Sequence, residues 1–454
     1  MAGGEPIPRR ASDPAAYSLR VDIKGARPKA RQYARGTSGF RYWAASDALA
    51  RGAKFWSKHL PGEQWFTGKS LPVALDRGVD LNAYYDRRGL SFFHERVGAS
   101  TVYSGESPDI LLHEMGHAVL DIIRPQLWDA LSVEAAAFHE SFGDICAILV
   151  GLQSSELRQA VLAEVGSKLY RSSRLSRVAE ELGWAIRQFE PSGAAPDALR
   201  NAVNSFFYRV PESLPPSAPD SHLSSEPHSF SRVFTAGAFE AMSNMVALLG
   251  KPTDAILAQV SDDFAHLLVE AIRDAPIAPD YFAQVAEQLI AADQDVFSGR
   301  YGSAIESAFI RRGVLSIHGV SPSASQRRAQ VRGRSRRLGV SRARSIFGLT
   351  KLPMLTIPGA TFGLGETNLH VHVASEAPRI LKATSAAAVT AAQPDAEMAA
   401  RWFTERLLCR GRVDLGGVHA THVAHPMHPH KTHSLDPDNG AVLLRRRTFD
   451  CGFD

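Results

Sequence analysis

The sequence predicts an α+β protein, because short strand-like segments come first along the chain and long helical segments follow. The early segments have strand length and are separated by turn residues such as glycine and aspartate; they cover residues 71–74, 81–85, 90–94 and 101–103. Apolar residues then recur with helical spacing over residues 107–123, 133–152, 155–170, 175–189, 228–249, 253–272, 280–292 and 301–312. Strands followed by a run of helices is the order typical of the α+β class.

Changes in composition divide the 454 residues into four predicted parts. Residues 1–44 are rich in arginine, proline and glycine without periodicity, so we expect a flexible lead-in. Residues 45–316 contain the strands and helices of the main domain. Residues 317–345 form a linker with eight arginines and no acidic residue. Residues 346–454 have strand-like and helical segments of their own, which predict a small α/β domain of unknown role.

The composition is typical of a globular protein that buries a core, with 44% hydrophobic and 22% charged residues. The formal net charge is only +4, so nucleic acid is expected as a partner only through the arginine-rich linker, and a plain basic linker is the alternative. No segment reaches the roughly 18 apolar residues that a membrane helix needs. The first residues also lack a signal-peptide pattern. We therefore expect a cytoplasmic protein with no membrane anchor.

The cysteines, and the histidines between residues 419 and 433, are weaker indications of chemistry. Three cysteines, Cys146, Cys409 and Cys451, lie far apart, which favours reduced thiols and leaves a bridge between Cys409 and Cys451 open. Histidines recur with prolines between them at His419, His422, His425, His428, His430 and His433. Because proline prevents a continuous helix, we expect a loop there, either solvated or able to bind metal weakly.

The strongest chemical signal is the sequence His113-Glu114-Met115-Gly116-His117 in the first long helix after the strands. Histidines four residues apart on a helix lie on one face, so both imidazoles can reach one metal ion. Glu114 points beside the ion, where a base can take a proton from the attacking water. A surface helix with two solvated histidines is the alternative.

The next helix supplies a third candidate ligand. Glu140 offers a carboxylate oxygen, and a catalytic zinc site uses three protein ligands and leaves a fourth position open. Asp144 follows one helical turn later, where it can accept the free N–H of a ligand histidine. Without the preceding motif, Glu140 and Asp144 would be interpreted as an ordinary acidic helix face.

These two helices resemble those of the gluzincins, and of the thermolysin-like metallopeptidases in particular, whose pattern is HExxH on one helix and ExxxD on the next. The resemblance covers about residues 45–316. It implies a zincin catalytic domain with an N-terminal mixed sheet, active-site helices and a C-terminal helical subdomain. It also implies Zn²⁺ as cofactor, held by His113, His117 and Glu140, and a peptide or protein as substrate.

Three further segments match the same family. The run that begins Leu81-Asn82-Ala83 is similar to its substrate-binding edge strand, in which Asn82 would bind substrate backbone by its side chain and Ala83 by its carbonyl. The run that ends at Arg200 is similar to its Asp-x-Leu-Arg, which implies that Arg200 binds substrate and pairs with Asp144. The helix that starts at His228 resembles the one whose histidine donates to the oxyanion.

The sequence also departs from the family. No tyrosine stands between residues 121 and 133 to assist the oxyanion, so that role is unassigned. The acid that orients His228 is not in register, and Glu226 and Asp220 are both candidates.

The sequence thus predicts a zinc-dependent peptidase in which Glu114 is the general base. The alternative is a zinc-binding module that binds peptides with little catalysis. The peptidase interpretation requires Glu140 to face both imidazoles, and it requires the space beside Glu114 to be open to substrate.

Overall fold

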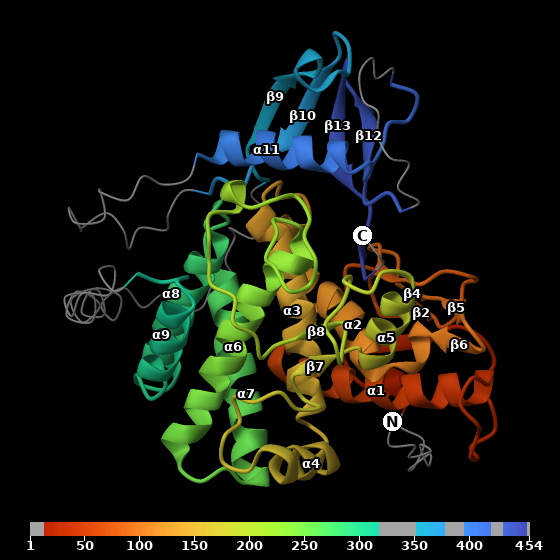
Figure 1. Cartoon of the computed structure of the whole chain (residues 1–454), viewed down its shortest axis with the longest axis vertical. Coiled ribbons are helices and arrows are strands. Elements are labelled where there is room, and N and C mark those ends of the chain that lie inside the picture. Colours follow the sequence, from red (N-terminus) through yellow and green to blue (C-terminus); the bar gives the residue numbers. More distant parts are fainter. Residues whose placement is uncertain (1–12, 317–350, 377–394, 419–429, 452–454) are drawn as a thin grey trace.

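The computed structural model of the protein describes residues 13–316, 351–376, 395–418 and 430–451. Over these residues it is an α+β protein with two five-stranded sheets (Figure 1). The helices are α1 Ser38–His59, α2 Pro108–Ile123, α3 Val133–Gly151, α4 Ser155–Val165, α5 Glu180–Phe189, α6 Pro227–Leu249, α7 Asp254–Asp274, α8 Tyr281–Val296, α9 Gly302–Arg311 and α11 Ala396–Cys409. Short 3-10 turns lie at Pro14–Ala16, Ser104–Glu106, Pro125–Trp128, Pro211–Ser213 and Gly359–Phe362.

The first sheet has the strand order β1-β2-β4-β3-β14. Its members are β1 Arg20–Ile23, β2 Ser70–Ala74, β4 Leu90–Phe92, β3 Ala83–Tyr85 and β14 Phe449–Asp450. The β1–β2 and β2–β4 pairs are parallel, whereas β3 runs antiparallel to both β4 and β14. Strand β14 lies at one end of this sheet, although it comes more than 360 residues after its neighbour β3 in the sequence.

Two small antiparallel pairs accompany the first sheet. Strands β5 His94–Val97 and β6 Ser100–Tyr103 form a hairpin directly before α2. Strands β7 Arg177–Val178 and β8 Arg200–Asn201 pair with each other, and α5 lies between them in the sequence. The helix expected over residues 175–189 therefore starts only at Glu180, because Arg177 and Val178 bond to β8 instead.

The structure differs from the predicted flexible lead-in. Residues 1–12 lie outside the described residues, but Arg20–Ile23 form β1, and Leu19 and Val21 are fully buried. Helix α1 begins at Ser38, because the side chain of Thr37 caps it by accepting from the backbone N–H of Phe40. A four-residue strand is too short to show periodicity amid arginine and proline, which explains the wrong prediction.

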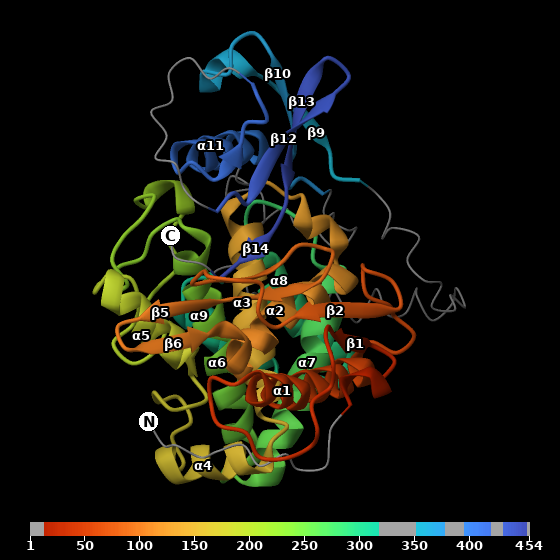
Figure 2. The ribbon, with the colours of Figure 1, turned by 90° about the vertical axis from the view of Figure 1, so that its right-hand side faces the viewer.

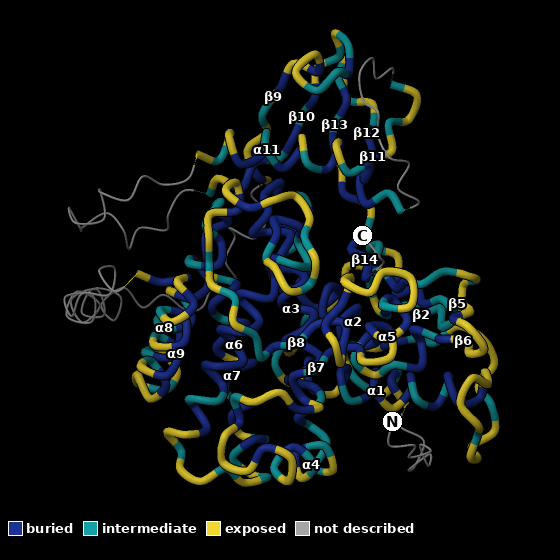
Figure 3. Tube along the Cα trace, viewed as in Figure 1, coloured by how far each residue is buried: buried dark blue, intermediate teal, exposed yellow. Residues whose placement is uncertain are grey.

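Helices α2 and α3 lie at the centre of the molecule and are buried along nearly their whole length (Figure 3). They pack closely because Gly116 of α2 faces Gly143 of α3; a Cβ added to Gly116 would lie 2.8 Å from the Cα of Gly143. Helix α6 packs against the other side of α3. Two neighbouring buried helices thus carry the residues of the predicted metal site.

The second sheet has the order β11-β12-β13-β10-β9 and is accompanied by α11 (Figure 1). Its strands are β9 Met354–Pro358, β10 Asn368–His372, β11 Val413–Asp414, β12 His433–Asp438 and β13 Ala441–Arg446. The chain leaves β13 and enters the first sheet as β14, next to α2 and α3 (Figure 2). The predicted domain boundary at residue 346 stays a prediction. Strand β14, which comes after that boundary in the sequence, belongs to the first sheet.

Some predictions concern residues that the structure does not describe. The arginine-rich linker and His419, His422, His425 and His428 lie outside the described residues. The expected loop is wrong for His433, which begins β12 and is fully buried because it pairs with Arg446 of β13.

Within the described ranges, no single helix is long and apolar enough to cross a membrane. Helices α3 and α4 satisfy the length and composition test only as a pair, bent by 100°.

Candidate metal centre

Helix α2 presents His113 and His117 toward α3. Ser107 caps its start by accepting from the N–H of Ile110 at 3.5 Å, and Pro108 occupies the first helical position. The helix ends at Ile123, two residues before Pro125, as the sequence predicts. The two imidazole rings lie 4.8 Å apart, centre to centre, and at most 1% of either residue is exposed.

Helix α3 brings Glu140 to both imidazoles. Glu140 Oε2 lies 3.2 Å from His113 Nε2, and Glu140 Oε1 lies 3.8 Å from His117 Nε2. Two ligand atoms about 2.0–2.1 Å from a tetrahedral zinc ion are about 3.3 Å apart, so these separations fit a common ion. One donor atom from each of the three residues falls within 4.8 Å of the others.

His117 provides an independent test of whether a metal fits. It is fully buried, and neither of its ring nitrogens has a hydrogen-bond partner among the described residues. A buried polar atom without a partner costs about 1–3 kcal/mol. Burial also lowers the pKa of His117 well below its usual value, which keeps the ring neutral with a free lone pair. A neutral imidazole aimed at a carboxylate and a second imidazole is suited to zinc.

Asp144 fixes the orientation of His113. Its Oδ1 lies 2.9 Å from His113 Nδ1, and Arg200 donates two hydrogen bonds to the same carboxylate, at 3.0 and 2.9 Å. Burial opposes ionisation, but the Arg200 guanidinium lowers the pKa of Asp144 below its usual range. The ionised Asp144 accepts the N–H at Nδ1, which leaves the Nε2 lone pair of His113 for a metal. The resemblance implied this pairing of Arg200 with Asp144.

Glu114 lies beside this group and is fully buried. Neither of its carboxylate oxygens has a hydrogen-bond partner among the described residues. Burial raises the pKa of Glu114 to about 8. A carboxyl group with such a pKa exchanges a proton near neutral pH, which is what a general base and acid must do.

His228 lies on the opposite side of Glu140, at the start of α6. Its Nδ1 is 2.8 Å from Glu226 Oε1, and its Nε2 is 3.2 Å from Glu140 Oε2. The sequence left two candidates for the acid that orients His228. Glu226 is the one that contacts His228, whereas Asp220 pairs with Arg232.

The main chain of β14 occupies the positions expected for substrate. His228 Nε2 donates to the backbone carbonyl of Asp450 at 2.7 Å. The carbonyl of Ala83 accepts from the N–H of Cys451 at 2.9 Å. The Ala83 carbonyl thus bonds main chain of this same protein, and its predicted hydrogen bond to substrate backbone stays a prediction.

The Asn82 side chain contacts residues of its own chain. Only 2% of the residue is exposed, and its Oδ1 accepts from the neighbouring N–H of Ala83 at 2.7 Å. Its Nδ2 lies 3.4 Å from His430 Nδ1. The predicted hydrogen bond from the Asn82 side chain to substrate backbone stays a prediction.

Sequence reasoning missed Phe449, Asp450 and Cys451. A donor atom of Cys451 lies within 4.8 Å of donor atoms of both His113 and Glu114. All three cysteines are free, so the bridge between Cys409 and Cys451 is not formed. A two-residue strand has no periodic signal, and no spacing rule connects a single cysteine 334 residues after the HExxH motif to the candidate metal ligands.

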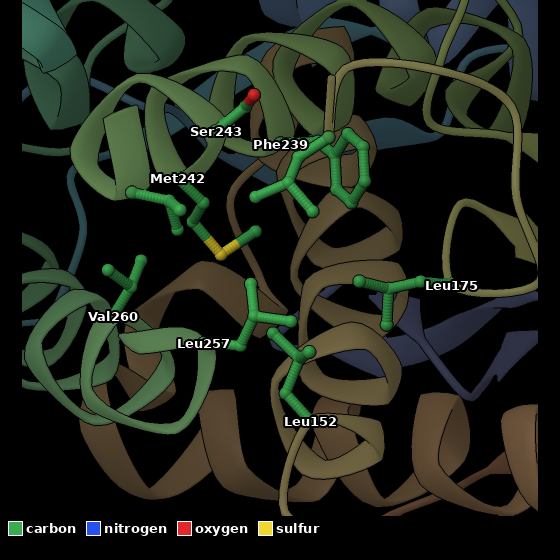
Figure 4. Close-up of a pocket in the computed structure, with 9 residues that line it drawn as sticks. Leu152, Leu175, Phe239, Met242, Ser243, Leu257 and Val260 are labelled. Carbon is green, nitrogen blue, oxygen red and sulfur yellow. The ribbon is translucent and has the colours of Figure 1, made fainter. Parts of the chain in front are cut away.

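A separate pocket lies away from this site, between α3, α6 and α7. It is lined by Ser243 and by apolar side chains such as Leu152, Phe239, Met242 and Leu257 (Figure 4). A single hydroxyl group among apolar walls offers no set of groups for catalysis or metal binding, so this pocket does not compete with the candidate metal centre as a functional site.

Searches against protein-family models and against curated proteins give no match to this sequence.

Proposed function

We propose that the protein is a zinc-dependent peptidase of the gluzincin type, with a thermolysin-like domain over about residues 45–316. One observation supports this most strongly: His113, His117 and Glu140 converge from two helices, with unpartnered nitrogens on His117 and unpartnered oxygens on Glu114 beside them. Zinc, when bound, supplies the Lewis acid that makes water a nucleophile near neutral pH.

Glu114 acts as the base and then as the acid. It accepts a proton from water as the water oxygen bonds to the carbonyl carbon of the substrate. It then returns the proton to the amide nitrogen as the C–N bond breaks. Burial raises the pKa of this carboxyl group to about 8, so at pH 7 the two protonation states differ by only about 1.4 kcal/mol and the group can both accept and return a proton.

His228 stabilises the charge that develops on the carbonyl oxygen. Glu226 accepts from one ring nitrogen, and the other nitrogen already donates to a backbone carbonyl, that of Asp450. One donor of this kind typically contributes on the order of 3 kcal/mol to the transition state. Arg200 acts as a positioning residue, because its guanidinium holds the Asp144 carboxylate against His113.

Strand β3 indicates the substrate class. An extended peptide can pair with the edge of a sheet through its main chain, whatever its side chains. The pairing of β14 with β3 shows that this edge accepts an antiparallel strand next to Glu114 and His228. We therefore infer that the substrate is an extended segment of a peptide or protein.

The test is the substitution Glu114→Gln, made in a Cys451→Ala parent so that the 446–451 segment supplies no thiol. We expect zinc content to stay at the parent's level, while hydrolysis of casein falls by about 10²–10⁴-fold. Glu156→Gln, an exposed carboxylate on α4, is the matched control and should cleave at the parent rate. A Glu114→Gln protein that cleaves as fast as its parent refutes the proposal.

A zinc-binding module with little catalysis is the second candidate, and burial favours it. His113, Glu114, His117 and Glu140 are at most 2% exposed, so the closed form gives substrate no access to them. Residues 449–451 contribute to this closure, because the Phe449 ring lies 4.9 Å from the ring of His117 and Cys451 is buried beside His113 and Glu114. One experiment distinguishes the two candidates. Once β14 is released from β3, a peptidase cleaves peptides and a zinc-binding module does not.

A further inference from the structure

We propose that the protein hydrolyses a peptide bond of its own chain, the bond between Asp450 and Cys451. This inference rests on the proposed function, and it names a substrate for the same centre. The reaction is intramolecular, because a peptide group at the end of β14 takes the place that a separate peptide would otherwise occupy.

The oxygen of this peptide group is bonded to His228. The Nε2 atom of His228 donates to the Asp450 carbonyl oxygen at 2.7 Å, and the same nitrogen lies 3.2 Å from Glu140, one of the candidate metal ligands. In the proposed reaction, His228 stabilises the charge that develops on the carbonyl oxygen of the bond being cut. The Asp450 carbonyl therefore already has the donor that its hydrolysis needs.

The nitrogen of the same peptide group is bonded to the start of β3. The Cys451 N–H donates to the Ala83 carbonyl at 2.9 Å, beyond the pairs that Phe449 and Asp450 form with β3. Ala83 and His228 are far apart in the sequence, yet they bond the two ends of one peptide group. An extended substrate strand would need main-chain bonds of this kind. This double contact is the main support for the proposal.

The candidate base lies beside the residue that follows the bond. Donor atoms of Glu114, His113 and Cys451 lie within 4.8 Å of one another, and 3% or less of each residue is exposed. Glu114 is thus beside the residue whose nitrogen has to receive a proton when the bond breaks. The Cys451 thiol takes up room next to this carboxylate, so a smaller side chain at position 451 leaves more space for the attacking water.

Contacts of two side chains fix the register of β14 against β3. The Phe449 ring stacks on the His139 ring at 3.9 Å, and the Asp450 carboxylate accepts from Arg412 at 3.4 Å. A shift by one residue along β3 would turn both side chains to the opposite face of the sheet and break these contacts. The bond after Asp450 is therefore the one held at the candidate metal centre.

The reaction consumes one water molecule and needs no other reactant. The water oxygen bonds to the Asp450 carbonyl carbon while Glu114 accepts a proton from the water. The C–N bond then breaks, and Glu114 returns this proton to the Cys451 nitrogen. The products are a chain that ends in the Asp450 carboxyl group and a piece that begins with the Cys451 amine. Because the base and the bond belong to one chain, the rate does not depend on protein concentration.

The experiment uses the full chain, purified with a chelator and then supplied with Zn²⁺ at neutral pH. Intact-mass spectrometry follows the wild type, Glu114→Gln and the control Glu156→Gln, which changes an exposed carboxylate on α4. We expect the wild type and the control to be cut after Asp450, and Glu114→Gln to be cut at least about 100-fold more slowly. A zinc-loaded wild type that stays intact, or that is cut at another bond within residues 446–451, overturns the proposal.

A mixture of two proteins distinguishes cutting within one chain from cutting between chains. ¹⁵N-labelled Glu114→Gln, incubated with unlabelled zinc-loaded wild type, should stay intact while the wild type is cut. The fraction of wild type cut per minute should also stay the same when the protein is diluted. Labelled chains that are cut at the wild-type rate would show an intermolecular reaction and overturn the proposal.

Amide exchange in the metal-free protein tests the position of the bond without any turnover. Residues 446–451 should exchange at least about tenfold more slowly in the full chain than in a free peptide of the same sequence, because β14 bonds β3. His228→Ala should speed their exchange, since the Asp450 carbonyl loses its donor, whereas Cys409→Ala on α11 should not. Exchange as fast as in the free peptide overturns the proposal.

Cys451→Ala separates this inference from the proposed function. The variant keeps the main-chain bonds and leaves more space beside Glu114, so we expect it to be cut at least as fast as the wild type and to cleave casein. Casein cleavage by this variant, with its bond after Asp450 intact, overturns the inference and leaves the peptidase. A zinc-loaded variant that cuts neither casein nor its own chain overturns both.

Discussion

Asp144 accepts hydrogen bonds from two residues of the candidate site, His113 and Arg200. Its ionised form is therefore needed for two reasons: it balances the buried guanidinium, and it holds the histidine in one tautomer. Residues that orient a metal ligand in this way typically change metal affinity by 10–100-fold when they are replaced.

We predict that Asp144→Asn lowers zinc affinity by about 10–100-fold, measured by competition with a chromogenic chelator. The amide keeps the shape but cannot accept from both partners with the strength of a carboxylate. Asp254→Asn is the matched control, because Asp254 also pairs with an arginine, Arg158, but at the surface. Equal zinc affinity in Asp144→Asn and wild type would contradict the assignment.

At this scale the sequence predicts that His113, His117, Glu140 and Asp144 lie together, because helical spacing fixes which side chains share a face. It did not predict that the Asn82 side chain bonds its neighbour Ala83, or that Cys451 lies beside His113 and Glu114. Neither contact follows from the spacing of residues within one element.

Among the elements, the α2–α3 pair determines the geometry of the metal centre. A Cβ added to Gly143 would lie 2.6 Å from two atoms of the His113 ring. That ring cannot easily move, because Asp144 and Glu140 both contact its nitrogens. Glycine at position 143 is therefore required by close approach.

We predict that Gly143→Ala destabilises the protein by roughly 1–3 kcal/mol through overpacking. It should also weaken zinc binding, because the ring has to leave its position between Asp144 and Glu140. Urea unfolding and chelator competition measure the two effects.

Gly151→Ala, at the end of the same helix, is the control for this prediction. There the added Cβ would meet the flexible end of Leu157 at 3.1 Å, so stability should change little. Gly143→Ala with wild-type zinc affinity would show that the ring has room to shift.

The elements themselves were predictable where local signals were strong. The range predicted for α2, residues 107–123, agrees with the structure, in which Ser107 caps the helix, Pro108 is its first residue and Pro125 follows its end. Strand β1 was missed, and so was the start of α1 at Ser38, which lies inside the predicted flexible lead-in. The strand that stabilises β1 is β2, about fifty residues away, which no local pattern can reveal.

For the whole molecule, Glu134 connects three parts of the fold. It lies in α3, accepts from Tyr208 at 2.6 Å and accepts from the N–H of Phe282 in α8 at 2.8 Å. Burial raises the pKa of Glu134 to about 8. The unfolded chain has the ordinary value of 4.5, so the folded state keeps a proton that the unfolded state has already released.

We therefore predict that this group makes the protein less stable as pH rises from about 4.5 to 8, by at most about 1.4 kcal/mol per pH unit. Glu134→Gln cannot ionise, so its stability relative to wild type should increase over this range. Urea unfolding of the metal-free proteins at several pH values measures the difference. Glu156→Gln should show no such trend, and a pH-independent difference for Glu134→Gln would contradict the prediction.

The α+β class was predictable from element order, but the joining of the two sheets was not. Strand β14 pairs with β3 through two residues, Phe449 and Asp450, whose sequence gives no strand signal. Phe449 packs against Trp128 and His139, which come from a much earlier part of the chain, and Asp450 accepts from Arg412.

The late position of β14 has a consequence for biosynthesis. A ribosome adds about 5–20 residues per second, so the 140 residues from 312 to 451 take roughly 7–28 s to make once α9 is complete. During that interval the nascent chain already contains α2, α3 and β3 but not β14. The candidate ligands His113, His117 and Glu140 are therefore made before the later strand, and β3 is for that time an unpaired edge to which a neighbouring nascent chain can add.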